Sequence, residues 1–301
     1  MSPAIIRPSV CHDSIKVDLV APALGAELSN ICLADAGRDR DQLAEIRSLL
    51  LKHKVLFFRD QDITPLEQQV FAEQFGQLDV HPLAPMHPEA PGLLPIHRNT
   101  GTSMYGEADK HSYENAWHSD LSYTPSPPMG AVLRCLTCPE IGGDTMWANM
   151  VLAYERLPEH VRHEIDGLFA KHAIEHTFGA SRPYEERLAL GAKRPPVEHP
   201  VVRTHPETGE RILYVSAFAS HFSNYHNWNR VRYGQDFQIE SNRLMDYLVS
   251  QAAIPEYQVR LRWKPNTVAF WDNRSTQHYA LHDYTEPRSM LRAAIMGDRP
   301  V

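Results

Sequence analysis

Residues 117–120 read WHSD, and residues 271–278 read WDNRSTQH directly after an apolar stretch that is typical of a buried strand. On a strand, side chains two positions apart point to the same face, so His118 and Asp120 are placed to grip one metal ion. We expect His278 to supply a third ligand. Two histidines and one carboxylate leave half of an octahedron open, which suits a non-haem Fe(II) that must also bind O2 and a co-substrate.

The spacing by itself leaves other interpretations open. The chain has 17 histidines, so an H-x-D triplet arises readily by chance, and these residues could instead be core or solvated side chains. The single C-x-x-C formed by Cys135 and Cys138 lacks the second pair of a zinc site. We interpret the four cysteines as reduced thiols, with a redox role as the alternative.

The composition is that of an ordinary globular chain. Of its 301 residues, 43% are hydrophobic and 22% are charged, and the formal net charge of −7 provides no basic surface for nucleic acid. No apolar run approaches the roughly 20 residues that span a bilayer, and no signal-peptide pattern is found. We therefore expect a cytoplasmic protein without a nucleic-acid or membrane partner.

Outward from the metal motifs, the sequence predicts a β core with helices packed outside it. Residues 41–53 and 64–75 have helical spacing, and in the second segment Thr64 can cap the helix, with Glu67 at the capping-box position. Repeated prolines and glycines then favour short strands. Further helices are predicted within 150–169 and 236–250, and strands at 54–58, 129–136, 259–263, 267–271 and 290–296.

Further motifs accompany these in a fixed order along the chain. They are GAE at 25–27, FFRDQ at 57–61, ITP at 63–65, FG at 75–76, GGDTMW at 142–147, HPVVRTHP at 199–206, WDNR and HYA within 271–280, and DY at 283–284 ahead of Arg288 and Arg292. In this combination the sequence resembles the taurine dioxygenase and 2,4-D dioxygenase (TauD/TfdA) family of Fe(II)/2-oxoglutarate-dependent dioxygenases.

The resemblance implies a mainly β fold with flanking helices, namely a double-stranded β-helix or cupin-like jelly roll, in a single domain over residues 1–301. It assigns the iron to His118, Asp120 and His278. It places the C5 carboxylate of 2-oxoglutarate on Arg288 and Thr145. This pairing is chemically sound, because a guanidinium binds a carboxylate bidentately and a hydroxyl donates one further hydrogen bond.

The same resemblance bears on the substrate. His81 and Arg292 match positions that bind the substrate anion in taurine dioxygenases, which implies a pocket for a small sulfonate, sulfate, phosphonate or carboxylate. The alternatives are a turn-capping His81 and surface arginines. Ala84 and Glu114 stand where taurine enzymes carry Tyr and Asn, which weakens a taurine assignment. Residues 221–236, HFSNYHNWNRVRYGQD, are predicted to form a lid or an oligomer contact, with a solvated loop of no specific role as the alternative.

The implied activity is that of a dioxygenase that uses Fe(II), 2-oxoglutarate and O2 to hydroxylate a small anionic organic substrate, such as a sulfonate, alkyl sulfate or aryloxyalkanoate, and releases succinate and CO2. Hydroxylation beside sulfur or oxygen would cleave the C–S or C–O bond. The alternatives are the same chemistry on an amino acid or phosphonate in a biosynthetic pathway, a metal-binding jelly-roll protein without oxygenase activity, and a hydrolytic metalloenzyme. The family also implies a homo-oligomer, either a dimer or a tetramer.

Overall fold

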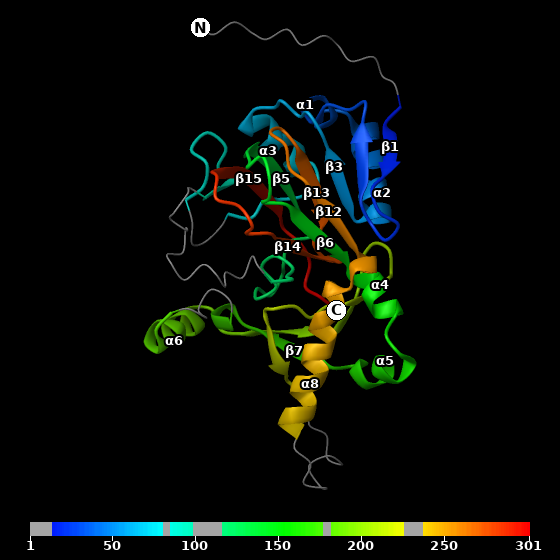
Figure 1. Ribbon diagram of the computed structural model, residues 1–301, viewed down its shortest axis with the longest axis vertical. Helices are drawn as coiled ribbons and strands as arrows, with labels where there is room; N and C mark the ends of the chain where they lie inside the picture. Colours follow the sequence, from blue (N-terminus) through cyan, green and yellow to red (C-terminus); the bar gives the residue numbers. More distant parts are fainter. Residues whose placement is uncertain (1–13, 81–84, 99–115, 177–181, 226–236) are drawn as a thin grey trace, which may run out of the picture.

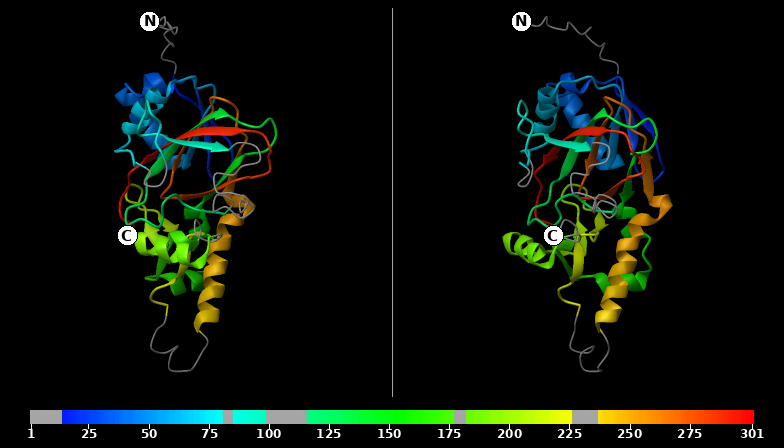
Figure 2. Two further views of the ribbon diagram at one scale, coloured as in Figure 1. Left: turned by 90° about the vertical axis from the view of Figure 1, so that its left-hand side faces the viewer. Right: turned by 60° about the vertical axis from the view of Figure 1, so that its left-hand side comes forward.

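The computed structural model describes residues 14–80, 85–98, 116–176, 182–225 and 237–301. A seven-stranded main sheet fills the upper part of the molecule, and a three-stranded sheet packs against one of its faces (Figure 1). In both views of Figure 2, a mostly helical part lies below the main sheet, and the long helix of residues 237–250 runs along one side of it. The predicted β core with helices outside it is confirmed.

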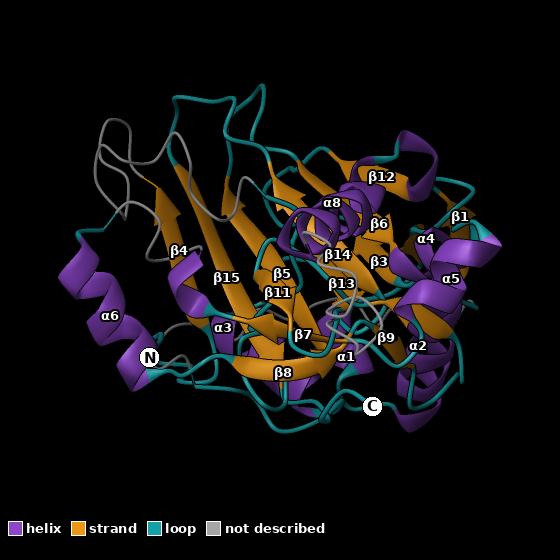
Figure 3. Ribbon diagram, turned by 90° about the horizontal axis from the view of Figure 1, so that it is seen from below, coloured by secondary structure: helices purple, strands orange, loops and turns teal. Residues whose placement is uncertain are grey.

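The main sheet consists of β1 (Lys16–Leu19), β2 (Ala26–Ser29), β3 (Val55–Phe58), β4 (Leu94–Arg98), β5 (Gly130–Thr137), β13 (Val268–Asp272) and β15 (Arg288–Ile295). Their order across the sheet is β1-β2-β3-β13-β5-β15-β4, and Figure 3 shows them side by side. Every neighbouring pair is antiparallel except β2 and β3. Strands from late in the chain therefore lie between strands from early in it.

Strand β3 explains why both faces of the main sheet are covered. Its four side chains, read VLFF, are all fully buried, as the unbroken apolar run predicts. Because side chains alternate along a strand, Val55 and Phe57 pack toward the small sheet, whereas Leu56 and Phe58 pack toward helices. The small sheet has the order β12 (Gln258–Leu261), β6 (Thr145–Asn149), β14 (Thr276–Ala280). The covering helices are α1 (Leu33–Ala36), α2 (Arg40–His53) and α3 (Pro65–Glu73).

Helices α2 and α3 confirm the two helices predicted in this region, to within two residues at each boundary. In α3 the capping box forms as predicted, because Thr64 Oγ1 accepts from the Glu67 backbone N–H and the Glu67 carboxylate accepts from the Thr64 N–H. Buried positions recur at helical spacing along α3, which places Phe71 in the core, edge-on to Phe75 and Phe270.

The lower part contains a second apolar cluster. Pro158 separates α4 (Met150–Glu155) from α5 (Glu159–Ile165), as the predicted break requires, and α8 (Phe237–Ser250) packs beside them. Elements that the sequence did not predict include α6 (Tyr184–Lys193), none of whose side chains is fully buried, and the sheets β11-β7-β8 and β10-β9. Their bounds are β7 (Phe169–His172), β8 (Val197–Pro200), β9 (Val202–Thr204), β10 (Arg211–Leu213) and β11 (Ala219–Phe222). None of the described helices is long and apolar enough to cross a membrane.

Candidate metal centre and anion clamp

The three predicted metal ligands converge although they come from segments 158 residues apart. His118 Nε2 and His278 Nε2 each lie 3.8 Å from Asp120 Oδ1, and the three ligand atoms all lie within 4.8 Å of one another. Donor atoms that bind one ion at about 2 Å are at most roughly 4 Å apart, so small side-chain rotations would close this site on an ion. All three residues are buried. The arrangement fits a metal ion held by two imidazoles and one carboxylate.

The tautomer of His118 also fits metal binding. Its Nδ1 lies 2.8 Å from the carbonyl oxygen of Ala116. Because a carbonyl only accepts hydrogen bonds, Nδ1 carries the proton and Nε2 presents its lone pair toward Asp120. A second hydrogen bond of this kind fixes the ring orientation of histidine ligands in metal sites.

Residues 118–120 do not form a regular strand. His118 and His278 pair through their backbones in a single antiparallel bridge, with N···O distances of 3.1 and 2.8 Å, and a turn begins at Asp120. Leu121, the next residue, has a left-handed φ of 52°, which ends any extended chain there. The two ligands therefore converge for a reason other than the alternation of a strand.

That reason is Asn273, which continues the pairing with its side chain. Its Oδ1 accepts from the Asp120 backbone N–H at 2.8 Å, and its Nδ2 donates to the Asp120 carbonyl at 3.0 Å and to the Pro128 carbonyl at 3.1 Å. Ser119 Oγ adds a bond to the Thr276 carbonyl at 2.9 Å. The carboxamide of Asn273 thus substitutes for the peptide group that a neighbouring strand would have offered.

The residue before Asn273 is fixed by a buried ion-pair network. Asp272 accepts from His205 Nε2 at 2.7 Å and from Arg274 Nε at 3.0 Å, and its side chain is 1% exposed. Burial alone would raise the pKa of Asp272, but these two partners hold the pKa well below its ordinary range. A permanently ionised Asp272 therefore anchors the turn that carries Asn273.

Replacing Asn273 by alanine is expected to weaken both the fold and the metal site. The change leaves the Asp120 N–H and C=O buried without these partners, at a cost of about 2–4 kcal/mol in the free energy of unfolding. Affinity for Fe(II) is expected to fall by about 10- to 100-fold, because the ligand's backbone is no longer held. Urea unfolding and anaerobic Fe(II) titration measure the two effects, with exposed Asn242 on α8 replaced by alanine as the control. Unchanged Fe(II) affinity would refute this role.

Two buried histidines hold the turn that follows Asp120. His199 Nε2 donates to the carbonyls of Ser122 and Thr124 at 2.9 and 3.0 Å, and His172 Nδ1 lies 3.1 Å from Ser122 Oγ. The rings are 5.1 Å apart. Burial lowers the pKa of His172 from 6.5 to about 3, with the neighbouring His199 adding to the effect, and burial lowers the pKa of His199 to about 4. Both side chains are therefore neutral near pH 7.

This pair predicts a loss of stability on acidification. Between pH 6.5 and the lowered pKa values, the unfolded chain binds protons that the folded chain does not, so the free energy of unfolding falls as the pH falls. Each histidine contributes about 1.4 kcal/mol per pH unit in this window. The His172→Gln variant should show a slope smaller by about that amount in urea unfolding between about pH 6 and 4.5. Replacing exposed His163 by glutamine should leave the slope unchanged.

The predicted 2-oxoglutarate residues also lie together. Thr145, the first residue of β6, and Arg288, the first residue of β15, are both buried, with Arg288 Nη2 3.4 Å from Thr145 Oγ1. Arg288 Nε is buried and has no hydrogen-bond partner among the described residues. A cation and a hydroxyl are thus held side by side in an interior site, which is an arrangement that binds a carboxylate.

The loop before Thr145 requires glycine. Gly142 and Gly143 have φ values of 86° and 68°, and a Cβ on Gly142 would lie 2.7 Å from the Asp283 carbonyl oxygen. The Gly143 N–H donates to Asp283 Oδ1 at 2.8 Å. The GGDT segment is therefore docked on the loop between β14 and β15, which brings Thr145 to Arg288.

Arg292 lies four residues after Arg288, on the same face of β15. Its Nη1 donates to both carboxylate oxygens of Asp120, at 3.1 and 3.0 Å. Because Asp120 is also grouped with the two histidines, Arg292, whose side chain is 11% exposed, places a positive charge directly beside the candidate metal centre.

The sequence model of the family described as "Taurine catabolism dioxygenase TauD, TfdA family" matches residues 16–294. The chain belongs to the TauD/TfdA family. Its similarity to the "Alpha-ketoglutarate-dependent sulfate ester dioxygenase" of Pseudomonas putida is 33% identity over 100% of this chain and 96% of the relative. The "Alkylsulfatase" of Acinetobacter baylyi is 35% identical, over 89% of this chain and 80% of its own length. A solved taurine dioxygenase from Burkholderia xenovorans has a TM-score of 0.77 at 33% identity, over 96% of this chain and 91% of that one.

Membership of the TauD/TfdA family confirms the predicted enzyme class and its use of Fe(II), 2-oxoglutarate and O2. Of the seven predicted site residues, His81 lies outside the described part of the chain, as do Ala84 and Glu114. The other six occupy two neighbouring groups, one around Asp120 and one around Thr145. Only residues 221–225 of the predicted lid are described, and they include the end of β11.

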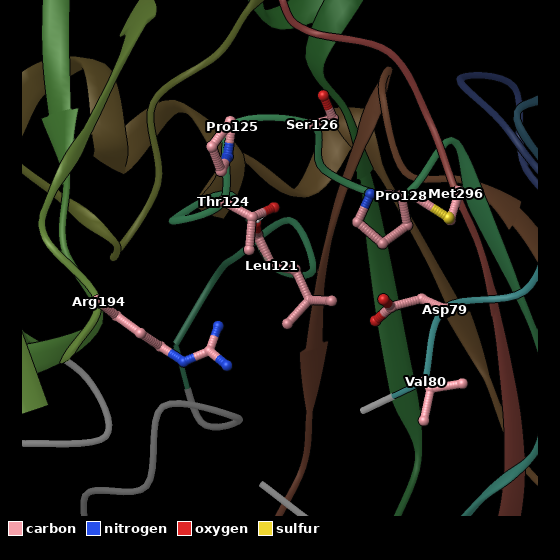
Figure 4. A pocket seen from close by; sticks show the side chains of 9 residues that line it. All are labelled: Asp79, Val80, Leu121, Thr124, Pro125, Ser126, Pro128, Arg194 and Met296. Atoms are coloured by element: carbon pink, nitrogen blue, oxygen red, sulfur yellow. Dashed lines mark hydrogen bonds between the residues drawn. The ribbon is translucent and has the colours of Figure 1, made fainter. Parts of the chain in front are cut away.

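This TauD/TfdA protein has a pocket of about 350 Å³ whose lining includes Leu121. Arg194 and Asp79 reach toward it from opposite sides, with Leu121 between them (Figure 4). Leu121 directly follows Asp120 and packs against Phe218, whose ring is 6.1 Å from that of His118. The remaining lining residues are Val80, Thr124, Pro125, Ser126, Pro128 and Met296.

Proposed function

We propose that this protein hydroxylates sulfate esters of small alcohols, in a reaction that depends on Fe(II) and 2-oxoglutarate. The observation that carries the proposal is the adjacency of two cationic groups to one candidate metal centre. Arg292 contacts Asp120 directly, whereas Arg288 lies with Thr145 at the beginning of the same strand. Two separate anions, a substrate and 2-oxoglutarate, can therefore be bound on one side of the metal. A hydrolytic metal site has no need of the second cation.

In this proposal His118, Asp120 and His278 hold the iron, whose ligand set leaves positions open for other molecules. When bound there, Fe(II) activates O2 for the oxidative decarboxylation of 2-oxoglutarate and the oxidation of a substrate C–H bond. Arg288 and Thr145 hold the C5 carboxylate of 2-oxoglutarate. Their burial excludes water, which strengthens these charge-assisted bonds.

Arg292 is proposed to orient the substrate's anionic group. A guanidinium has five N–H donors in a planar fork, so one arginine can bind more than one anionic group. The substrate's sulfate would share this cation with Asp120, so that its first carbon faces the metal. His81 stays a predicted second contact, and the predicted lid at 221–236 stays a prediction too.

The choice of a sulfate ester rests on the relatives. Two of them, at 33% and 35% identity, are named as a sulfate ester dioxygenase and an alkylsulfatase. Hydroxylation of the carbon attached to the ester oxygen gives a hemiacetal sulfate. That species releases inorganic sulfate and a proton as its C–O bond breaks, leaving an aldehyde. One oxygen atom of O2 enters the substrate and the other enters succinate.

The arrangement of the two sheets also supports the proposal. We infer that the main sheet and the β12-β6-β14 sheet are the two halves of a double-stranded β-helix, with the candidate site between them, and that residues 1–301 form one domain. The apolar cluster shared by Phe57 of β3, Trp147 of β6 and Trp271 of β13 supports this. The cytoplasmic location and the dimer or tetramer stay predictions.

Succinate release tests the proposal. The purified protein with Fe(II), ascorbate and 2-oxoglutarate is offered a panel of alkyl sulfates, sulfonates, aryloxyacetates, phosphonates and amino acids. We expect turnover to be highest with alkyl sulfates and to yield sulfate and aldehyde in a 1:1 ratio with succinate. Anaerobic addition of Fe(II) and 2-oxoglutarate should produce a weak visible charge-transfer band. Absence of this band overturns the oxygenase assignment, whereas preference for another substrate overturns only the sulfate ester.

A further inference from the structure

Trp263 follows β12 and lies in the apolar cluster between the two sheets, where it is 3% exposed. Its indole N–H nevertheless has a polar partner, because Nε1 donates to Thr145 Oγ1 at 2.9 Å. The guanidinium carbon of Arg288 lies 6.0 Å from the centre of the indole rings, within reach of a cation–π interaction. One buried side chain therefore contacts both residues that are proposed to hold the C5 carboxylate of 2-oxoglutarate.

These contacts determine what the Thr145 hydroxyl can do. Its oxygen faces Trp263 Nε1 at 2.9 Å and Arg288 Nη2 at 3.4 Å. Indole and guanidinium nitrogens only donate hydrogen bonds, so both contacts use lone pairs of the hydroxyl oxygen. The hydroxyl hydrogen must then point away from both, toward an acceptor. Thr145 is thereby set as a donor, which is the role that an incoming carboxylate requires.

We propose that Trp263 is a positioning residue for 2-oxoglutarate. Its indole N–H orients the Thr145 hydroxyl as a donor, and its ring stabilises the Arg288 guanidinium by a cation–π interaction. The inference rests on the proposed 2-oxoglutarate clamp and adds a member to it. Trp263 does not contact the metal group, so its contribution is confined to the far carboxylate of the co-substrate.

A neighbouring indole provides a matched control. Trp147 is fully buried, its ring centre lies 6.4 Å from that of Trp263, and its Nε1 has no hydrogen-bond partner among the described residues. Tryptophan-to-phenylalanine substitution at either position removes a buried N–H and shrinks a core ring. Only the substitution at Trp263 removes a hydrogen bond to Thr145.

The test compares two 2-oxo acids by titration calorimetry on Fe(II)-loaded protein without O2. 2-Oxopentanoate has the same chain length as 2-oxoglutarate but lacks the C5 carboxylate. In the Trp263→Phe variant we expect the Kd for 2-oxoglutarate to rise about tenfold, from loss of one buried hydrogen bond. The Kd values for 2-oxopentanoate and for Fe(II) should change less than about twofold. The Trp147→Phe variant should bind both acids as the unsubstituted protein does.

The outcomes separate this inference from the proposed function. Equal weakening of both 2-oxo acids, or no weakening of either, overturns the role of Trp263. In a Thr145→Val background, Trp263→Phe should reduce 2-oxoglutarate affinity less than it does in the unsubstituted protein, because only its contact with Arg288 is left to lose. A fully additive loss would also overturn the role of Trp263. If the unsubstituted protein binds no 2-oxoglutarate, the proposed function itself fails. Urea unfolding of each variant checks that the fold is retained.

Discussion

Replacement of Asp120 by alanine is expected to reduce succinate release by more than about a thousandfold, as is typical when an essential catalytic group is removed. The change leaves two imidazoles as ligands. It also leaves the Arg292 cation, now without the carboxylate that lies 3.0–3.1 Å from it, beside the site where a divalent cation must bind. Both effects act against Fe(II), so the loss is expected in metal binding as well as in turnover.

Anaerobic Fe(II) titration and succinate release measure this prediction together. The control is Asp62→Ala, since Asp62 has an 89% exposed side chain and does not belong to the metal group. Asp120→Ala protein that still binds one Fe(II) with the original affinity and turns over would show that the His-Asp-His group is not the catalytic metal site.

Replacement of Arg288 by alanine is expected to raise the KM for 2-oxoglutarate by about a hundredfold, since charge-assisted hydrogen bonds to a buried carboxylate contribute up to about 3 kcal/mol. Arg288 does not contact any of the three metal-site residues, and its nearest polar partner is Thr145. Affinity for Fe(II) should therefore be unchanged. The KM for the substrate should also change little, because Arg292 remains in place.

Steady-state kinetics with varied 2-oxoglutarate provide the measurement, and exposed Arg243 on α8 replaced by alanine provides the control. A fall in kcat at saturating 2-oxoglutarate without a rise in KM would contradict the clamp. Such a result would place Arg288 among residues that act on the reacting atoms instead.

The sequence predicts local elements well where periodicity and capping agree. Helix α3 is an example, since Thr64 and Glu67 mark its beginning and the structure reproduces their reciprocal bonds. Helix α6 was not predicted; none of its side chains is fully buried, and of its residues only Leu190 packs against a core cluster. The short strands β7, β9, β10 and β11 were also missed although they contribute to the second apolar cluster, because three or four residues are too few to show a periodic pattern.

The sequence predicts which residues form the candidate site, but not which contacts bring them together. His118, Asp120 and His278 are identifiable from ligand chemistry and family motifs. Their convergence depends on Asn273. This residue is part of the WDNR motif, but the spacing of the motif does not predict that its side chain bonds to the Asp120 backbone. Trp263 reads as a core aromatic, and its hydrogen bond to Thr145 follows only from the strand pairing of β12 with β6.

The strand order of the main sheet has a consequence for the synthesis of the chain. β13 lies between β3 and β5, and β15 lies between β5 and β4, although both are translated after all three neighbours. While the ribosome is still making residues 138–267, β3, β5 and β4 lack the strands that will lie between them, so their edges are unpaired. The sheet can close only after translation has passed β15. Because His278 also follows residue 267, the proposed metal site can form only in a nearly finished chain.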